Sequence, residues 1–297
     1  MKVGYFPGCS LHATSREYEE SLQAIAPVLN IELEEIRDWA CCGASSAHVT
    51  NHALGVALPA RTLVLARKQN LDKIFAPCAA CYNRLASAQH TLANDKKLAL
   101  HIQSMLGGDL DNSIRVLSIA QLLSGLTDEI AQASKALLKN LKVACYYGCL
   151  LVRPPEICNF DDPEAPTSLE RIAIATGAAP VKWDMALECC GGGFSLSRTA
   201  SVVRLSRSIL QSARNAGAQA LVVACPMCHS NLDFRQDAIN RRGNEPPLPV
   251  LFVSQLVGLA MGLDPVRLGL SRHFVSPELL LRQIRAAGSE PERREQA

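Results

Sequence analysis

Ten of the chain's twelve cysteines form two copies of one pattern, which is the feature of the sequence with the clearest chemistry. Each copy has a single cysteine, then a Cys-Cys-Gly triplet, then a Cys-x-x-Cys pair. The interval from the second cysteine of the triplet to the pair is 36 residues in one copy and 35 in the other. The first copy consists of Cys9, Cys41, Cys42, Cys78 and Cys81, and the second of Cys149, Cys189, Cys190, Cys225 and Cys228.

Five thiols in each copy predict a multi-iron centre. A tetrahedral metal ion or a cubane iron–sulfur cluster takes four thiolates, so each copy has one sulfur to spare. Soft thiolate ligands select iron–sulfur clusters or zinc, and a set of five fits zinc poorly. Zinc in one of the two motifs stays open as a minor alternative. We therefore expect all ten motif cysteines to bind the iron of two clusters.

Four further side chains need separate treatment. Cys145 and Cys158 lie outside the pattern, and we expect them to be core or loop residues rather than ligands. His48 lies six residues after the first Cys-Cys pair, and His229 directly follows the last motif cysteine. Because imidazole titrates near neutrality, both histidines are weak candidates for proton donors, while no catalytic residue is otherwise indicated.

Composition and charge exclude several functional classes. The chain has 297 residues, of which 48% are apolar, and 30 basic against 28 acidic side chains, so it is globular and lacks a nucleic-acid footprint. Its longest apolar stretch, Val250 to Leu263, is too short to cross a membrane, and the N-terminus does not resemble a signal peptide. We expect a cytoplasmic protein, in which reduced cysteines indicate metal or redox chemistry rather than disulfides.

The cysteine pattern returns at nearly constant offsets along the chain. The offset is 140 residues for the single cysteine, 148 for the first cysteine of the triplet and 147 for the pair. An internal duplication with one insertion of about eight residues accounts for all three. We predict a first domain over residues 1–140, a second over 141–288 and a charged, disordered tail over 289–297.

Each copy alternates between strand and helix patterns, which predicts an α/β fold of two pseudo-symmetric, Rossmann-like domains with parallel sheets flanked by helices. Helices are expected at Ser15–Leu29, Ala53–Gln69 and Tyr82–Leu92, and one ends at Met261. Strands are expected at Val3–Phe6, Ile31–Ile36 and Lys73–Ala76 in the first copy, and at Val143–Tyr146, Val181–Trp183, Ala220–Val223 and Val250–Val253 in the second.

Every cysteine group in this scheme follows a strand and precedes a helix. Ligands of open α/β sheets bind beyond the carboxyl ends of the strands, and helix N-termini there favour negative charge. Such positions lower thiol pKa values and suit an anionic, thiolate-ligated cluster. The duplication further predicts a pseudo-twofold arrangement in which both cysteine sets face one shared cavity.

The doubled Cys, Cys-Cys-Gly, Cys-x-x-Cys pattern resembles the cysteine-rich CCG domains found in the B subunit of heterodisulfide reductase. The flanks match as well: Tyr147-Gly148-Cys149 with Arg153-Pro154 and Asp161-Asp162-Pro163 resembles the start of that family's second domain. The segment from Pro249 to Leu270 resembles its C-terminal part, so the resemblance covers about residues 1–275.

The resemblance implies two noncubane [4Fe-4S] clusters, each held by the five cysteines of one motif. Together the clusters would reduce or form a disulfide in one-electron steps. The resemblance also implies two partners in one complex, namely a ferredoxin-like iron–sulfur subunit plus a flavoprotein subunit, with a small disulfide or thiol as substrate. The substrate stays open between the heterodisulfide of methanogens and a thiol or persulfide of a bacterial, sulfur-oxidising branch.

A different oxidoreductase is the alternative. CCG domains also occur in the iron–sulfur electron-transfer subunits of glycolate, lactate and succinate oxidoreductases. Those chains often carry ferredoxin-like CxxCxxCxxxCP runs, and the absence of such a run here favours the disulfide enzyme.

Overall fold

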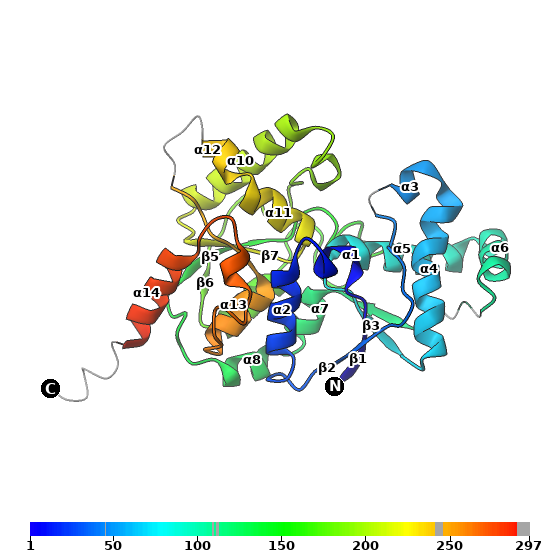
Figure 1. The fold of residues 1–297 in the computed structure, drawn as a ribbon, viewed down its shortest axis with the longest axis horizontal. Coiled ribbons are helices and arrows are strands. Elements are labelled where there is room, and N and C mark those ends of the chain that lie inside the picture. The colour runs from blue at the N-terminus through cyan, green and yellow to red at the C-terminus, as the bar shows by residue number, and fades with distance from the viewer. Residues whose placement is uncertain (45, 109, 111–112, 241–245, 290–297) are drawn as a thin grey trace.

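The computed structural model describes the whole chain except residues 45, 109, 111–112, 241–245 and 290–297 (Figure 1). It contains two four-stranded sheets in which all strand pairs are parallel. The first sheet has the order β2-β1-β3-β4, with β1 (Lys2–Tyr5), β2 (Glu32–Glu35), β3 (Lys73–Phe75) and β4 (Arg115–Leu117). The second has the order β6-β5-β7-β8, with β5 (Lys142–Tyr146), β6 (Ala179–Pro180), β7 (Ala220–Val223) and β8 (Val250–Phe252). The predicted α/β class with two similar domains is confirmed.

Two strands differ from the prediction. The sequence indicates no strand at β4, which has only three residues and pairs with β3 at the edge of its sheet. The strand predicted at Val181–Trp183 is wrong in position, because β6 covers the two residues before it. Proline at the end of β6 lacks an N–H for the ladder, and the chain then leaves the sheet, so that the Trp183 indole donates to the carbonyl of Cys145 at 3.0 Å.

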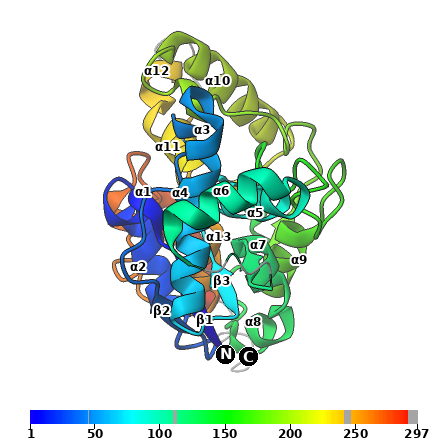
Figure 2. The ribbon, with the colours of Figure 1, turned by 90° about the vertical axis from the view of Figure 1, so that its right-hand side faces the viewer.

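Helices cover the faces of both sheets (Figures 1 and 2). The four predicted helices are confirmed within a few residues at α2, α4, α5 and α13. The first copy has α1 (Gly8–His12), α2 (Arg16–Ile25), α3 (Ala47–Thr50), α4 (His52–Lys68), α5 (Ala79–Asn94), α6 (Lys96–Leu106), α7 (Ile119–Ser124) and α8 (Thr127–Ala133). The second has α9 (Ser168–Ala175), η1 (Gly192–Phe194), α10 (Thr199–Asn215), α11 (Pro226–Phe234), α12 (Gln236–Asn240), α13 (Val253–Ala260), η2 (Leu270–Arg272) and α14 (Glu278–Ser289).

The two copies join through pairs of helices that occupy equivalent places in each. Helix α2 of the first copy packs on α13 of the second, and α7 of the first packs on α9 of the second. A buried hydroxyl pair, Ser21 and Ser254 at 2.6 Å, joins α2 to α13. The side chains of Gln121 and Gln255 cap α7 and α13 in the same way, by accepting from the backbone N–H three residues earlier at 2.8 and 2.9 Å. The join is therefore pseudo-twofold, and one apolar core runs through both sheets.

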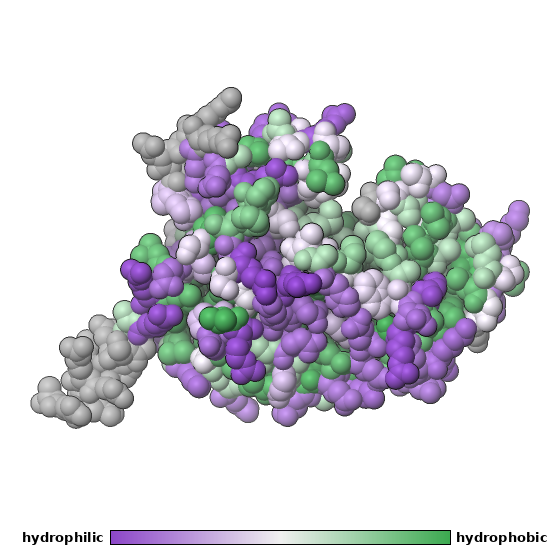
Figure 3. Space-filling view, viewed as in Figure 1, coloured by the Kyte–Doolittle hydropathy of each residue, from purple (hydrophilic) through white to green (hydrophobic). Residues whose placement is uncertain are grey.

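The surface has two lobes on the face shown in Figure 3, one over α10–α12 and one over α3 and α4, with a notch between them. Apolar side chains gather on the second lobe, where Val49 of α3 and Leu54 of α4 are exposed. At the other end of the chain α14 extends to Ser289. The rest of the predicted disordered tail lies outside the described residues.

Candidate functional site

The two Cys-x-x-Cys pairs meet where the copies join. Cys78 follows β3 and caps α5, and Cys225 follows β7 and caps α11, so each pair starts at the carboxyl end of a central strand. The thiols of Cys78 and Cys225 lie close enough across the interface to shift each other's pKa. The arrangement follows from the duplication, because the pseudo-twofold relation brings the same edge of both sheets together.

A continuous thiol row crosses this interface. The sulfurs of Cys42 and Cys81 lie 3.3 Å apart in the first copy, and those of Cys190 and Cys228 lie 3.4 Å apart in the second. Each of the remaining thiols shifts the pKa of its neighbour, which places the thiol row in the order Cys41, Cys42, Cys81, Cys78, Cys225, Cys228 and Cys190. Cys149 interacts with Cys189, next to the Cys190 end of the thiol row. Cys9 lies near Cys41, and both are exposed at the surface.

Glycines allow the backbone to approach these sulfurs. Gly8 and Gly148 precede the single cysteine of each copy with φ of 68° and 66°, a left-handed conformation that side chains disfavour. A Cβ on Gly8 would lie 2.9 Å from the Cys81 sulfur, and one on Gly148 would lie 3.3 Å from the Cys228 sulfur. The glycine of each Cys-Cys-Gly triplet also has positive φ, and its N–H donates to the first sulfur of that triplet, at 3.5 Å in the first copy and 3.3 Å in the second.

Hydrogen bonds between the thiols favour thiolates at defined positions. Interactions with the thiols of Cys41 and Cys81 lower the pKa of Cys42 to about 3. The thiol of Cys149 likewise lowers the pKa of Cys189 to about 6, and the Cys228 and Cys78 thiols hold the pKa of Cys225 well below its usual range. The donating thiols have raised pKa values in return. Iron-bound sulfurs are thiolates, so binding of a cluster would release the protons that these thiols retain.

The spread of the sulfurs fits a multi-iron cluster better than a single ion. Four thiolates on one zinc ion, at Zn–S distances of about 2.3 Å, would all lie within roughly 4 Å of one another. Among the described residues, the cysteine sulfurs form no group of three in which all lie within 4.8 Å of one another. An extended set of five soft donors instead suits several metal ions that share ligands. The donor set therefore fits an iron–sulfur cluster in each copy.

A cavity of about 350 Å³ lies between the copies. All five motif cysteines of the second copy line it, and none of the first copy does. The first copy instead contributes residues of α3, of α5 and of the loop before α3: Ala44, His48, Val49, Ala79, Ala80 and Arg84. The remaining wall comes from the second copy and is mostly apolar: Tyr147, Leu150, Gly192, Gly193, Phe194 and Met227. The cysteine sets do meet at the interface as expected, but the cavity borders the sulfurs of only one set.

The two histidine candidates lie in different surroundings. His48 lines the cavity, and its Nδ1 lies 3.4 Å from the carbonyl of Gly43. His229 does not line the cavity: it is 3% exposed, stacks on Phe252 at 4.2 Å, and its Nε2 donates to the carbonyl of Val250 at 3.1 Å. Burial holds the pKa of His229 well below its usual value. Only His48 is therefore positioned to exchange a proton with a molecule in the cavity.

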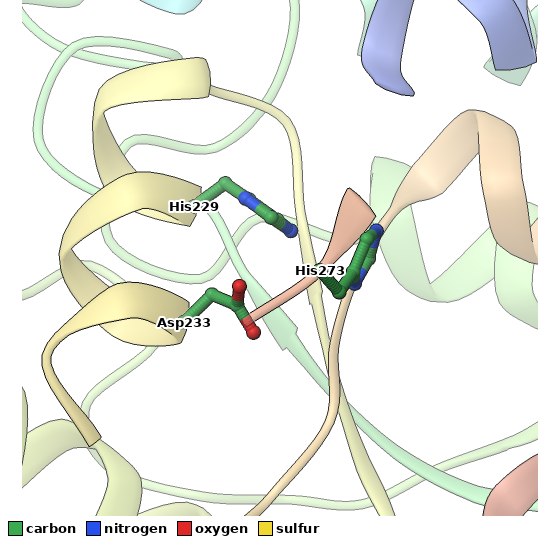
Figure 4. Close-up of side chains that lie close together, drawn as sticks. All are labelled: His229, Asp233 and His273. Carbon is green, nitrogen blue, oxygen red and sulfur yellow. The ribbon is translucent and has the colours of Figure 1, made fainter. Parts of the chain in front are cut away.

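His229 belongs to a buried polar group with Asp233 and His273, whose ligand atoms lie within 4.8 Å of one another (Figure 4). Most of these side chains' polar atoms are already engaged, although Nδ1 of His273 has no hydrogen-bond partner among the described residues. The Asp233 carboxylate accepts from the backbone N–H groups of Phe274 and Val275 at 2.7 and 3.1 Å, and His273 Nε2 lies 2.8 Å from the amide of Gln255. We interpret this group as an anchor that fastens the segment before α14 to α11.

The two cysteines outside the pattern are buried away from the thiol row. Cys145 lies within β5 with no exposed surface. Cys158 accepts from the amide of Asn83 at 3.3 Å, and burial raises the pKa of its thiol to about 11. Asn83 also donates to the carbonyls of Leu150 and Arg153, so this cluster ties α5 to the second copy.

Tyr18 is a central residue that the sequence did not reveal. Its hydroxyl lies 3.3 Å from the carbonyl of Pro77 and 3.4 Å from that of Ala224, the residues directly before Cys78 and Cys225. It is fully buried and its ring stacks on Phe252 at 4.0 Å. Nothing in the spacing of Tyr18 marks it, because no tyrosine occupies the corresponding place in the second copy.

Comparison with known proteins identifies the family. The model of the cysteine-rich CCG domain matches twice, over residues 3–86 and 143–233. The chain belongs to this family. The B subunit of a coenzyme B–coenzyme M heterodisulfide reductase from Methanosarcina acetivorans is 31% identical over 92% of this chain and 94% of its own length. The membrane anchor subunit of an 8-methylmenaquinol:fumarate reductase from Wolinella succinogenes is 35% identical over 92% of this chain and 97% of its own length. The resemblance to the B subunit of heterodisulfide reductase is confirmed.

One solved structure shares the fold. A hypothetical protein from Helicobacter pylori superposes with a TM-score of 0.70 at 11% identity, over 93% of this chain and 52% of that chain. Together the relatives support an iron–sulfur electron-transfer subunit of a multisubunit oxidoreductase. Within the described part of the chain, no helix has the length and apolar character needed to span a membrane.

Proposed function

We propose that this chain is the disulfide-active subunit of a heterodisulfide-reductase-like complex and that each cysteine set holds a noncubane [4Fe-4S] cluster. The observation that carries the proposal is the cavity between the copies, which all five cysteines of the second set border. The first set is linked to the cavity through the interaction of its Cys78 with Cys225, which is one of the lining cysteines. When bound, the clusters supply two adjacent one-electron sites, which suits the two-electron chemistry of an S–S bond.

The chain's own residues hold and shield the substrate. A disulfide takes up two electrons and two protons and leaves as two thiols, and in this family's complexes the electrons would come from an iron–sulfur partner subunit. Apolar side chains such as Leu150, Met227 and Phe194 exclude water from the cavity and favour the organic groups beside the sulfurs. His48 lies where it can donate a proton to a departing thiolate, because it is the one histidine among the described residues of the lining.

Metal analysis and activity test the proposal together. Protein purified without oxygen should contain about eight irons per chain, four for each set. With reduced methyl viologen as electron donor, it should reduce a small disulfide to thiols. Stoichiometric zinc with only four irons would reduce one set to a structural site. Eight irons without disulfide turnover by the assembled complex would contradict the disulfide chemistry while leaving the cluster sites intact.

The relative from Wolinella succinogenes supports a second candidate, the electron-transfer subunit of a quinone-linked fumarate or succinate oxidoreductase. The apolar lining of the cavity also suits a quinone ring. The same purified protein separates the two: oxidation of a reduced menaquinone analogue without disulfide turnover would favour this alternative. The reverse result would favour disulfide chemistry.

A further inference from the structure

Among the described residues that line the cavity, Arg84 is the one permanently charged side chain. It projects from α5, is half-buried, and its guanidinium donates to the amide oxygen of the neighbouring Asn83 at 3.0 Å. In the part of the chain that the structure describes, no carboxylate lies within ion-pairing distance of it. Other arginines of the chain do have such partners, for example Arg272 with Glu20 at 2.8 Å. The charge of Arg84 interacts with the thiols of Cys42 and Cys158, but no carboxylate among the described residues neutralises it.

The surroundings of Arg84 give this cation an unusual setting. Its neighbours in the lining include the small apolar residues Ala79 and Ala80 on the same helix and Leu150 and Met227 from the second copy. A guanidinium removed from bulk water is costly unless an anion or several acceptors pair with it. Such a cation in the wall of the cavity, beside His48 and the cysteines of the second copy, is placed to pair with an anionic group of a ligand.

Comparison of the two copies shows that the fold does not require an arginine here. The place of Arg84, three residues after Cys81, is taken in the second copy by Asn231, three residues after Cys228. Asn231 is buried, and it uses its amide to donate to the carbonyl of Cys190 at 3.2 Å and to accept from the hydroxyl of Ser195 at 2.9 Å. The second copy thus uses this position to brace its own cysteines, whereas the first presents a charge to the cavity.

A second polar group comes from the same copy. His48 lies in the lining six residues after Cys42, and the corresponding position in the second copy is Leu196, which is 98% exposed. The two basic side chains of the lining, Arg84 and His48, therefore both belong to the first copy. The sulfurs in the lining belong to the second.

We propose that Arg84, assisted by His48, binds an anionic group of the substrate and so directs its sulfur atoms toward the cysteine set of the second copy. This inference rests on the proposed disulfide function and adds a substrate class: small disulfides or thiols that carry a carboxylate or sulfonate. The planar guanidinium matches such a group with two parallel hydrogen bonds, which fix direction as well as binding.

A pair of disulfides that differ in charge tests the role of Arg84. The assay uses cluster-loaded protein, reduced methyl viologen, and either dithiodiglycolate, which has two carboxylates, or neutral bis(2-hydroxyethyl) disulfide. Arg84→Gln should raise KM for dithiodiglycolate by about tenfold or more while KM for the neutral disulfide changes by less than about twofold. KM of Arg84→Lys for dithiodiglycolate should lie between those of the wild type and Arg84→Gln, because lysine keeps the charge but cannot form two parallel hydrogen bonds with a carboxylate. Arg204→Gln, which removes an exposed arginine of α10 outside the cavity, is the matched control.

Equal effects of Arg84→Gln on both substrates, or no effect on either, would overturn the proposal. A fall in kcat alone on both substrates, with iron content unchanged, would also overturn it. Arg84→Lys keeps the test valid if Arg84→Gln loses iron, because lysine preserves the size and charge of the side chain.

A binding measurement separates this inference from the proposed function. Thiodiglycolate carries the same two carboxylates on a thioether that cannot be reduced. Calorimetric titration of cluster-loaded protein should show one site that weakens by about tenfold in Arg84→Gln. Arg84-dependent binding in a protein that turns over no disulfide would support the anion site and contradict the disulfide chemistry. Disulfide turnover with no Arg84-dependent binding would support the disulfide chemistry and contradict the anion site.

Discussion

The two copies of the cysteine motif share a strand order and a ligand pattern, but they differ in what surrounds the ligands. In the second copy all five cysteines border the cavity, and Asn231 braces the Cys-Cys pair from inside the protein. In the first copy the cysteines lie behind Ala79 and Ala80, and Arg84 faces the cavity instead. The duplication thus preserved the arrangement of the cysteines and changed the residues next to it, so that one copy presents cysteines to the cavity and the other presents a charge.

The largest expected effect comes from removing one ligand in each copy. Cys42→Ser and Cys190→Ser should each abolish the cluster of their own copy, because serine is a harder and more basic ligand than cysteine. If both clusters are needed for two-electron chemistry, each variant should lose disulfide turnover by more than about a hundredfold, and the double variant should lose little more. Iron content and viologen-linked turnover measure both effects.

Cys158→Ser is the control for these variants, because Cys158 is buried outside the thiol row and should leave iron content unchanged. Substantial turnover in Cys42→Ser would show that the second copy does the chemistry and the first only relays electrons.

The glycines before the single cysteines offer a finer comparison. Gly8→Ala and Gly148→Ala should each cost about 1–2 kcal/mol of folding free energy from positive φ. Gly8→Ala should also lose more iron than Gly148→Ala, because its Cβ would lie 2.9 Å from a sulfur rather than 3.3 Å. Gly217→Ala, with φ of 78° and no atom within 4 Å of the added Cβ, isolates the conformational cost. Equal iron loss in all three would show that the close contacts with sulfur do not matter.

Glu17, which lies beside His229, should make the stability of the folded protein depend on pH. Burial raises the pKa of Glu17 to about 7, and its carboxylate lies 3.8 Å from Nδ1 of His229. The unfolded chain ionises near its ordinary pKa of 4.5, so the folded state loses stability as pH rises from about 4.5 to 7. Glu17→Gln should remove this loss and gain about 1–2 kcal/mol at pH 8 relative to pH 6.

Urea unfolding of the wild type and the variant at both pH values measures the difference. Glu129→Gln, at an exposed position on α8, should show no such dependence. A gain of equal size at both pH values would indicate better packing rather than relief of a buried charge.

The smallest expected effect concerns Tyr18. Tyr18→Phe removes a hydroxyl that contacts carbonyls on both sides of the interface and should cost about 1 kcal/mol. Tyr146→Phe is the matched variant, because its hydroxyl donates to the carbonyl of Glu188 within one copy. The two should lose similar stability in urea, but only Tyr18→Phe should speed amide hydrogen exchange in β3 and β7 together. Exchange that speeds in one strand alone would contradict a bridging role for Tyr18.

Much of the fold could be predicted because the signals were local and repeated. Strands such as β1 and β7 are apolar runs that lie shortly before a motif cysteine, and each copy predicts the other. The strand β4 was not predicted, because three residues at a sheet edge are too few to show a hydrophobic periodicity. A comparison of Leu117–Leu122 with Leu251–Leu256 could have found it, since both segments place a glutamine in the same cap.

The ligand pattern was visible in the sequence, but the cavity was not. The spacing showed which cysteines belong together. The burial of His229 and the position of Arg84 in the cavity wall depend instead on which face of α11 and of α5 packs against the other copy. That choice is made by packing between segments that lie far apart along the chain. Tyr18 illustrates the same limit, because its partners come from both copies at once.

The exchange of equivalent helices across the join has a consequence for the origin of the chain. In α2 against α13, and in α7 against α9, each copy gives the other the same contact that it receives. This reciprocity is the mark of an isologous interface, the kind that two identical protein chains form about a twofold axis. An ancestor with one motif would have needed to dimerise before its Cys-x-x-Cys thiols could meet those of a neighbour. In a fused chain each half can change alone, which is consistent with the difference between Arg84 and Asn231 at equivalent positions.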